Sequence, residues 1–169
     1  KENLKILCGG EALDPALAHH LLRCCQELWN MYGPTETTIW SGALRLDKAN
    51  LIEQFVPIGG AIDNTQLYVL DTQQQPVPIG VPGELCIGGA GLSPGYLHRA
   101  ELTAEKFMAS PPDCLEKIGI AAGTLYKTGD LARYRANGTL EYLGRLAHQI
   151  QLRGFRIELG DIENALTQH

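Results

Sequence analysis

The segment that decides the fold class is "LKILCGGEALDPALAHHLLRCCQELWNMYG", residues 4–33. It begins with a short apolar run closed by glycines, and it ends with a second apolar run, residues 28–33. Between these runs, Asp14 and Pro15 form a good N-cap and first-turn pair for a helix. Leucines follow at helical spacing, at Leu17, Leu21, Leu22 and Leu28. The order strand, helix, strand predicts a βαβ unit at the end of a parallel sheet.

The next stretch, "NMYGPTETTIW" (residues 30–40), begins where the second strand is expected to end. In open α/β sheets, ligands usually bind at this edge. A rigid glycine-proline turn would hold Thr35 and Glu36 side by side, which suits a metal ion together with a phosphate oxygen. Tyr32 can offer its ring to a base. An ordinary turn between two strands is the alternative, and these residues alone do not decide between the two.

From about residue 56 the pattern changes to short strands separated by glycine and proline. Strands are expected in "QLYVLD", "GELCIGG", "GDLARYR" and "GTLEYLGR", with a hairpin at Asn137-Gly138 and a short helix in "AELTAEKF". Two further strands, "IQLRG" and "FRIEL", precede a helix in "GDIENALTQ". We predict an α/β fold: residues 1–55 end an α/β core subdomain, 56–146 form a β-rich, barrel-like subdomain, and 147–169 begin a small α+β subdomain.

Composition excludes several classes of function. The 169 residues carry a net charge of −5, so there is no basic footprint for nucleic acid or for an anionic membrane surface. No apolar run approaches the roughly 20 residues that span a bilayer, and no signal peptide is evident. A cytoplasmic protein is therefore expected. The five cysteines include no C-x-x-C pair, which argues against a zinc site or a disulfide framework.

Three later stretches carry candidate chemistry. In "LYKTGDLARY" (125–134), Asp130 can accept two hydrogen bonds from a diol such as ribose, although a turn aspartate is the alternative. "GELCIGGAGLSPGYL" (83–97) lacks the spacing of a phosphate loop, so its glycines are assigned to tight strand packing and not to catalysis. In "GRLAHQIQLRGFRIELGDIE" (144–163), Arg145, Arg153 and Arg156 are either site residues or partners in surface salt bridges.

Taken in order, "NMYGPTE" and these three stretches resemble successive motifs of the adenylation domains of nonribosomal peptide synthetases, in the superfamily of adenylate-forming enzymes. The resemblance covers the chain nearly end to end. "YGPTE" together with "LRGFRIELGDIE" favours the peptide synthetase branch. Two alternatives stay open: an acyl- or aryl-CoA ligase, and a non-catalytic half of an interrupted adenylation domain.

The resemblance implies that ATP and a carboxylate react to an acyl-adenylate, and that the acyl group then passes to a carrier-protein phosphopantetheine thiol. The implied cofactors are ATP and Mg²⁺, and the implied partners are a small amino acid, a peptidyl carrier protein and the rest of the synthetase chain. Carried over residue by residue, Thr35, Glu36 and Arg145 are catalytic, and Glu36 binds Mg²⁺. The nucleotide-binding residues are Gly10, Glu11, Asn30, Tyr32, Asp130, Tyr142 and Arg145.

Substrate choice and domain motion follow from the same resemblance. The amino-acid pocket is expected to be lined by Leu7, Gly9, Met31, Ile39 and Trp40. Because Trp40 and Met31 are bulky, they leave little space, and we expect glycine as substrate, with alanine next. Ala147 stands where the family's hinge aspartate is expected. The phosphate loop and the adenylate-contacting lysine fall outside these residues, so the 169-residue piece alone is expected to be a poor or inactive enzyme.

Overall fold

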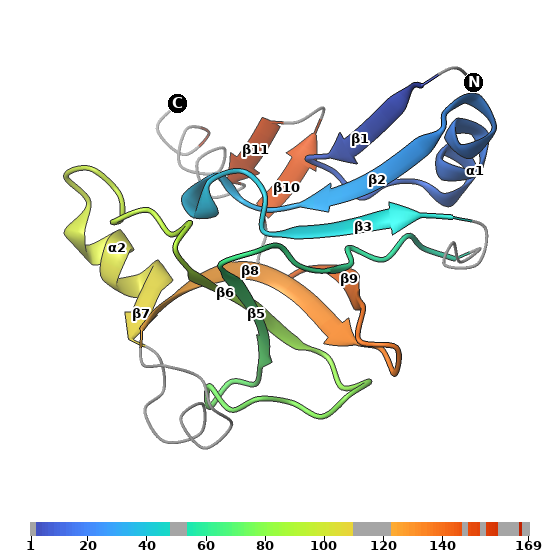
Figure 1. Ribbon diagram of the computed structural model, residues 1–169. Helices are drawn as coiled ribbons and strands as arrows, with labels where there is room; N and C mark the ends of the chain where they lie inside the picture. Colours follow the sequence, from blue (N-terminus) through green and yellow to red (C-terminus); the bar gives the residue numbers. More distant parts are fainter. Residues whose placement is uncertain are drawn as a thin grey trace.

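The computed structural model describes residues 3–47, 54–109 and 123–146, together with the backbone of 149–152 and 155–158 and the single residue Leu166. Within these residues, no helix is long and apolar enough to cross a membrane. Figure 1 shows the order of the elements along the chain.

The predicted βαβ unit is confirmed. Strand β1 (Lys5–Gly9) runs parallel to β2 (Glu27–Tyr32), and α1 (Pro15–Cys24) connects them. Asp14 caps the helix, since its carboxylate accepts the backbone N–H of Leu17 at 2.9 Å. The helix ends at Cys24, so Leu28 belongs to β2 instead, where it is fully buried.

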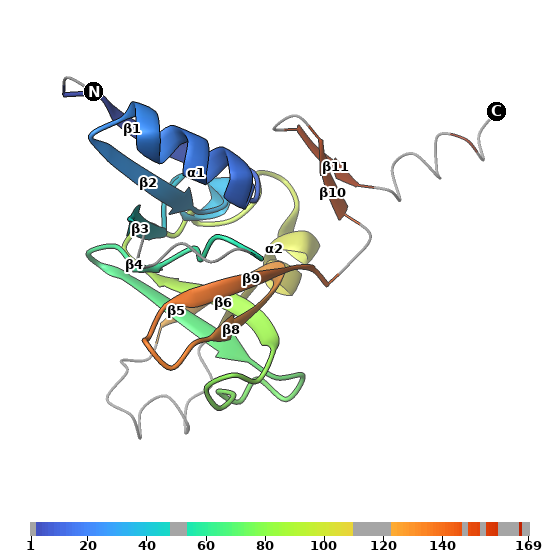
Figure 2. The ribbon, with the colours of Figure 1, turned by 90° about the vertical axis from the view of Figure 1, so that its right-hand side faces the viewer.

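Two antiparallel strands complete the first sheet. Strands β3 (Gly42–Leu46) and β4 (Gly60–Ala61) extend it to the order β1-β2-β3-β4. Helix α1 lies against the β1–β2 end of the sheet, as Figure 2 shows. A small core fills the layer between them, with Ala18, Cys25, Leu28, Leu46 and Val56 buried. Cys25 acts here as a small apolar residue.

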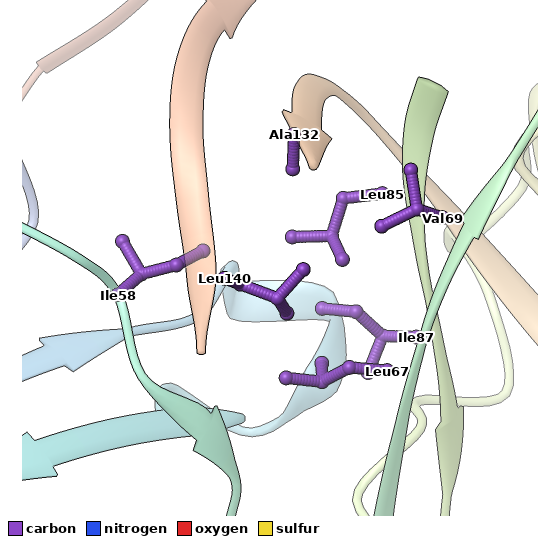
Figure 3. Packing of buried hydrophobic residues seen from close by; sticks show 7 residues of the cluster. All are labelled: Ile58, Leu67, Val69, Leu85, Ile87, Ala132 and Leu140. Atoms are coloured by element: carbon purple, nitrogen blue, oxygen red, sulfur yellow. The ribbon is translucent and has the colours of Figure 1, made fainter. Parts of the chain in front are cut away.

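The β-rich segment forms a second, antiparallel sheet. Its strands are β5 (Thr65–Leu70), β6 (Gly83–Gly89), β7 (Phe107–Ala109), β8 (Thr124–Tyr134) and β9 (Leu140–Arg145). The order is β5-β6-β8-β7, and β9 also pairs with β8. Helix α2 (Ala100–Lys106) leads directly into β7. Figure 3 shows the core of this sheet, formed by Ile58, Leu67, Val69, Leu85, Ile87, Ala132 and Leu140.

The hairpin predicted at Asn137-Gly138 joins β8 to β9. Only Gly138 has a positive φ, of 80°. Asn137 contributes through its side chain instead, because Asn137 Oδ1 accepts hydrogen bonds from the backbone N–H of Thr139 at 3.1 Å and from its hydroxyl at 2.7 Å.

The two short strands predicted near the carboxyl end are present as β10 (Gln149–Leu152) and β11 (Phe155–Glu158). They pair antiparallel. The helix expected at 160–168 lies outside the described residues, apart from Leu166. The division into segments 1–55, 56–146 and 147–169 stays a prediction.

Backbone hydrogen bonds join the two sheets. Ile58 N donates to Leu140 O at 2.9 Å, and Leu140 N donates to Gly59 O at 2.8 Å, so the segment before β4 pairs with the start of β9. Gly59 has a φ of 85°, and a Cβ on it would lie 2.2 Å from the carbonyl oxygen of Ala43. This junction therefore requires glycine, both for its backbone conformation and for its close packing.

Gly59→Ala is expected to destabilise the protein. The positive φ alone costs on the order of 1–3 kcal/mol, and the close approach to Ala43 adds to it. Gly60→Ala is the matched control, since Gly60 has no atom within 4 Å of its added Cβ and no positive φ. Urea unfolding of the wild-type protein and the two variants should show a large loss of unfolding free energy for Gly59→Ala. For Gly60→Ala the unfolding free energy should change by about 0.5 kcal/mol or less. Equal losses for the two variants would contradict the requirement for glycine at 59.

Candidate functional site

A cavity of about 560 Å³ opens at the carboxyl ends of β1 and β2. Its walls come from four parts of the chain: the loop from β1 to α1, the end of β2 with the following turn, the segment 54–58, and the β8–β9 pair. Nine of the predicted site residues line it, namely Gly10, Glu11, Asn30, Met31, Tyr32, Thr35, Asp130, Tyr142 and Arg145. This is the edge at which α/β sheets usually bind ligands.

A buried carboxylate, Asp130, forms part of the cavity wall. The residue is only 4% exposed. The Tyr32 hydroxyl donates a hydrogen bond to Asp130 Oδ2. Arg145 Nε lies 2.9 Å from Asp130 Oδ1 and forms an ion pair with it. Burial, reinforced by the negative charge of Asp130, raises the pKa of Tyr32 well above its usual value. The phenol therefore stays a protonated donor at neutral pH.

The part of β8 that carries Asp130 is held by its neighbours. Thr128 Oγ1 accepts the backbone N–H of Asp130 at 3.0 Å and donates to Leu85 O at 2.6 Å. Arg145 Nη1 donates to Thr128 O at 2.9 Å. Together these bonds tie strands β6, β8 and β9 around one carboxylate, so its position does not depend on a ligand.

Sequence reasoning missed the part that Glu84 has in holding this segment of β8. Gly129 has a φ of 72°, and its N–H donates to Glu84 Oε1 at 3.1 Å. Glu84 lies in "GELCIGG", which was assigned to strand packing alone. The sequence did contain one signal for this role, because Glu84 is a single carboxylate inside an otherwise apolar strand. A carboxylate among buried neighbours needs a hydrogen-bond partner.

Asn30 reaches the cavity from the end of β2. It is 3% exposed, and its Nδ2 donates to the carbonyl oxygen of Pro57 at 2.8 Å. That bond orients the amide, and its oxygen is an acceptor for a donor group such as an exocyclic amine. The predicted role for Asn30 is compatible with this geometry.

The turn after β2 contains a single 3₁₀ turn, η1 (Thr35–Thr37). Thr35 is exposed and lines the cavity, whereas Glu36 is buried and is not among the lining residues. Glu36 Oε1 accepts a hydrogen bond of 2.6 Å from the hydroxyl of Tyr96. Among the described residues, no three His, Cys, Asp or Glu side chains gather in a way that could hold a metal ion by themselves.

The predicted amino-acid pocket is only partly assembled around the cavity. Of its five residues, Met31 alone lines the cavity. The Trp40 ring packs directly on Gly9, because a Cβ on Gly9 would lie 2.5 Å from Trp40 Cη2. Leu7 and Ile39 are each 60% exposed. Gly9 and Leu7 alternate with Cys8 along β1, so they face away from the core under α1.

Several predicted residues cannot be placed in the site. Ala147 and Arg153 lie outside the described residues, and for Arg156 the structure describes only the backbone, within β11.

Comparison with known proteins identifies the family. The profile of the family described as "AMP-binding enzyme" matches residues 1–97. The chain belongs to this family. Its fold is that of the adenylate-forming enzymes, and the predicted resemblance to adenylation domains of nonribosomal peptide synthetases is confirmed.

The similar proteins are much longer than this chain. A dimodular nonribosomal peptide synthase from Bacillus subtilis (strain 168) is 51% identical over 166 residues, which are 98% of this chain and 7% of that protein. A nonribosomal peptide synthetase protein containing adenylation and PCP domains superposes with a TM-score of 0.86 at 33% identity, over 96% of this chain and 28% of that one. A four-domain synthetase bound to AMP and glycine superposes with a TM-score of 0.75 at 50% identity, over 98% of this chain and 12% of that one.

Proposed function

We propose that this chain contributes the adenosine-binding wall of a glycine-activating adenylation domain, which forms glycyl-AMP from ATP and passes the glycyl group to a carrier-protein phosphopantetheine thiol. The observation that carries the proposal is the cavity itself. Asn30, Tyr32, Asp130 and Arg145 come from segments about a hundred residues apart, yet they line one space of about 560 Å³. That volume is in the usual range for small-molecule sites.

Each wall residue offers chemistry that suits adenosine. The oriented amide of Asn30 presents an acceptor for an amino group, and the rings of Tyr32 and Tyr142 present apolar surface to a base. Asp130 offers a carboxylate, which has about four acceptor positions and can take both hydroxyls of a ribose in addition to its bonds within the protein. Tyr32 and Arg145 hold that carboxylate in place at the cavity wall.

The residues next to the cavity fit a bound Mg²⁺. In proteins, Mg²⁺ is usually held by one or two carboxylates together with substrate phosphates, and Glu36 supplies one carboxylate beside Thr35. When bound, the ion would offset the repulsion between the attacking carboxylate and the phosphate. Thr35, at the cavity wall, can donate its hydroxyl to a phosphate oxygen, and Arg145 adds positive charge to the same cavity.

Glycine is proposed because of the contact between Trp40 and Gly9. The indole ring lies where a side chain at position 9 would be, and packed interiors leave no room for overlap. With Met31 beside it, this arrangement favours the smallest amino acid, and alanine would be next. A relative that is 50% identical was solved bound to AMP and glycine, which supports the proposal.

A carrier protein is the proposed acceptor of the glycyl group. One relative that contains adenylation and PCP domains was solved in two structures, one of them in a holo form. Assembly with the rest of a synthetase chain is proposed on the same grounds, and the cytoplasmic location expected from the sequence is kept as a proposal.

Asp130→Asn tests nucleotide binding. In the full-length synthetase carrying this segment, the KM for ATP in glycine-dependent pyrophosphate exchange should rise about 10- to 100-fold, as expected for losing a charged hydrogen-bond acceptor. Asp63→Asn is the control, because Asp63 is exposed and lies outside the cavity. Equal KM values for Asp130→Asn and the wild-type enzyme would refute the assignment. Pyrophosphate exchange that depends on fatty or aryl acids, and not on amino acids, would favour the alternative of a CoA ligase.

Trp40→Ala tests the choice of amino acid. Removing the ring that packs on Gly9 should admit larger amino acids, so that the ratio of kcat/KM for alanine or valine to that for glycine rises by roughly 10-fold or more. Trp29→Ala is the matched control, since Trp29 is the only other tryptophan of the chain and its indole N–H donates to Glu27. An unchanged preference for glycine in Trp40→Ala would contradict the assignment of Trp40 to the amino-acid pocket.

A further inference from the structure

We propose that Tyr96 is a positioning residue for Glu36: its hydroxyl fixes the direction of the carboxylate and thereby sets the affinity of the site for a divalent cation. The inference rests on the proposed function. Tyr96 lies in the stretch "GLSPGYL", to which the sequence analysis gave no role beyond packing. Its hydroxyl donates to Glu36 Oε1 at 2.6 Å, across 60 residues of chain.

The segment that carries Tyr96 also holds the backbone of η1. Ser93 N donates to Glu36 O at 2.8 Å, and Thr38 Oγ1 donates to Gly91 O at 2.7 Å. A Cβ on Gly91 would lie 3.0 Å from Thr37 O, so the two backbones lie in close contact. Glu36 is therefore held at its main chain and at its carboxylate by one short segment, residues 91–96.

Tyr96 is itself fixed on the opposite side. Its ring meets Phe107 edge to face, with centroids 5.8 Å apart, and its hydroxyl lies 3.5 Å from that of Tyr126. Its backbone N–H donates to Thr103 Oγ1 at 2.9 Å, which anchors it on α2. Gly95 permits this approach, because it has a φ of 128° and a Cβ there would lie 2.4 Å from Thr103 Cγ2. The tyrosine is therefore a rigid donor.

The chemistry of the pair suits a cation site. The hydrogen bond from the Tyr96 hydroxyl occupies one acceptor position of the Glu36 carboxylate, at Oε1. A carboxylate has about four acceptor positions, so a bond at Oε1 is compatible with ligation of a metal ion. Mg²⁺ requires near-ideal octahedral geometry, and a carboxylate with a fixed direction meets that requirement better than one that rotates.

The test is Tyr96→Phe in the full-length synthetase, which keeps the ring and removes only the hydroxyl. Mn²⁺, used in place of Mg²⁺, is titrated in the presence of a non-hydrolysable ATP analogue and followed by electron paramagnetic resonance. The Kd for Mn²⁺ should rise about 10-fold, which is about 1.4 kcal/mol. Binding of the analogue without metal should change less than 2-fold. Tyr134→Phe is the control, since the hydroxyl of this half-buried tyrosine donates to Leu67 O at 2.6 Å, beside the core of the second sheet.

The outcomes separate the two proposals. A lowered Tm for Tyr96→Phe with an unchanged Kd for Mn²⁺ would show a purely structural hydroxyl and overturn this inference, while the proposed function stands. A wild-type enzyme that binds no nucleotide would overturn both. Where Tyr96→Phe yields no folded protein, Thr103→Val removes the acceptor of the Tyr96 N–H, and the same comparison applies: a raised Kd supports the inference, and an unchanged Kd contradicts it.

Discussion

The hydrogen bond from the Tyr32 hydroxyl to Asp130 is the contact on which the cavity depends. Tyr32 ends β2 in the first sheet, and Asp130 lies within β8 in the second. The bond therefore fixes the carboxyl end of the parallel strands against the β8–β9 pair. Arg145 offsets the charge of the buried carboxylate, without which burial of Asp130 would be strongly unfavourable. The proposed nucleotide binding and the joining of the two sheets thus use the same three side chains.

The fold could be predicted from the sequence where local patterns decide it. Asp14-Pro15 marked the start of α1, the apolar runs marked β1 and β2, and Asn137-Gly138 marked the hairpin between β8 and β9. Leu28 was placed with the helical leucines because its spacing matches the helix, whereas the chain has already turned into β2. Spacing does not show where a helix ends when no glycine or proline follows it.

The site was predictable only as a set of residues. Motifs indicated Tyr32 and Asp130, yet their hydrogen bond spans 98 residues and follows from the packing of two sheets, which no local pattern describes. The supporting residues were missed for the same reason. Glu84 and Tyr96 lie in a glycine-rich stretch that suggested packing, and their partners, Gly129 and Glu36, are distant in the sequence.

The most direct test of this account is a double-mutant cycle between Tyr32→Phe and Asp130→Ala, measured by urea unfolding of the 169-residue chain. If the bond joins the two sheets, the two substitutions should be coupled by about 1–3 kcal/mol, since each removes the partner of the other. Additive losses, with a coupling energy below about 0.5 kcal/mol, would contradict the account and show that the sheets are held together by other contacts.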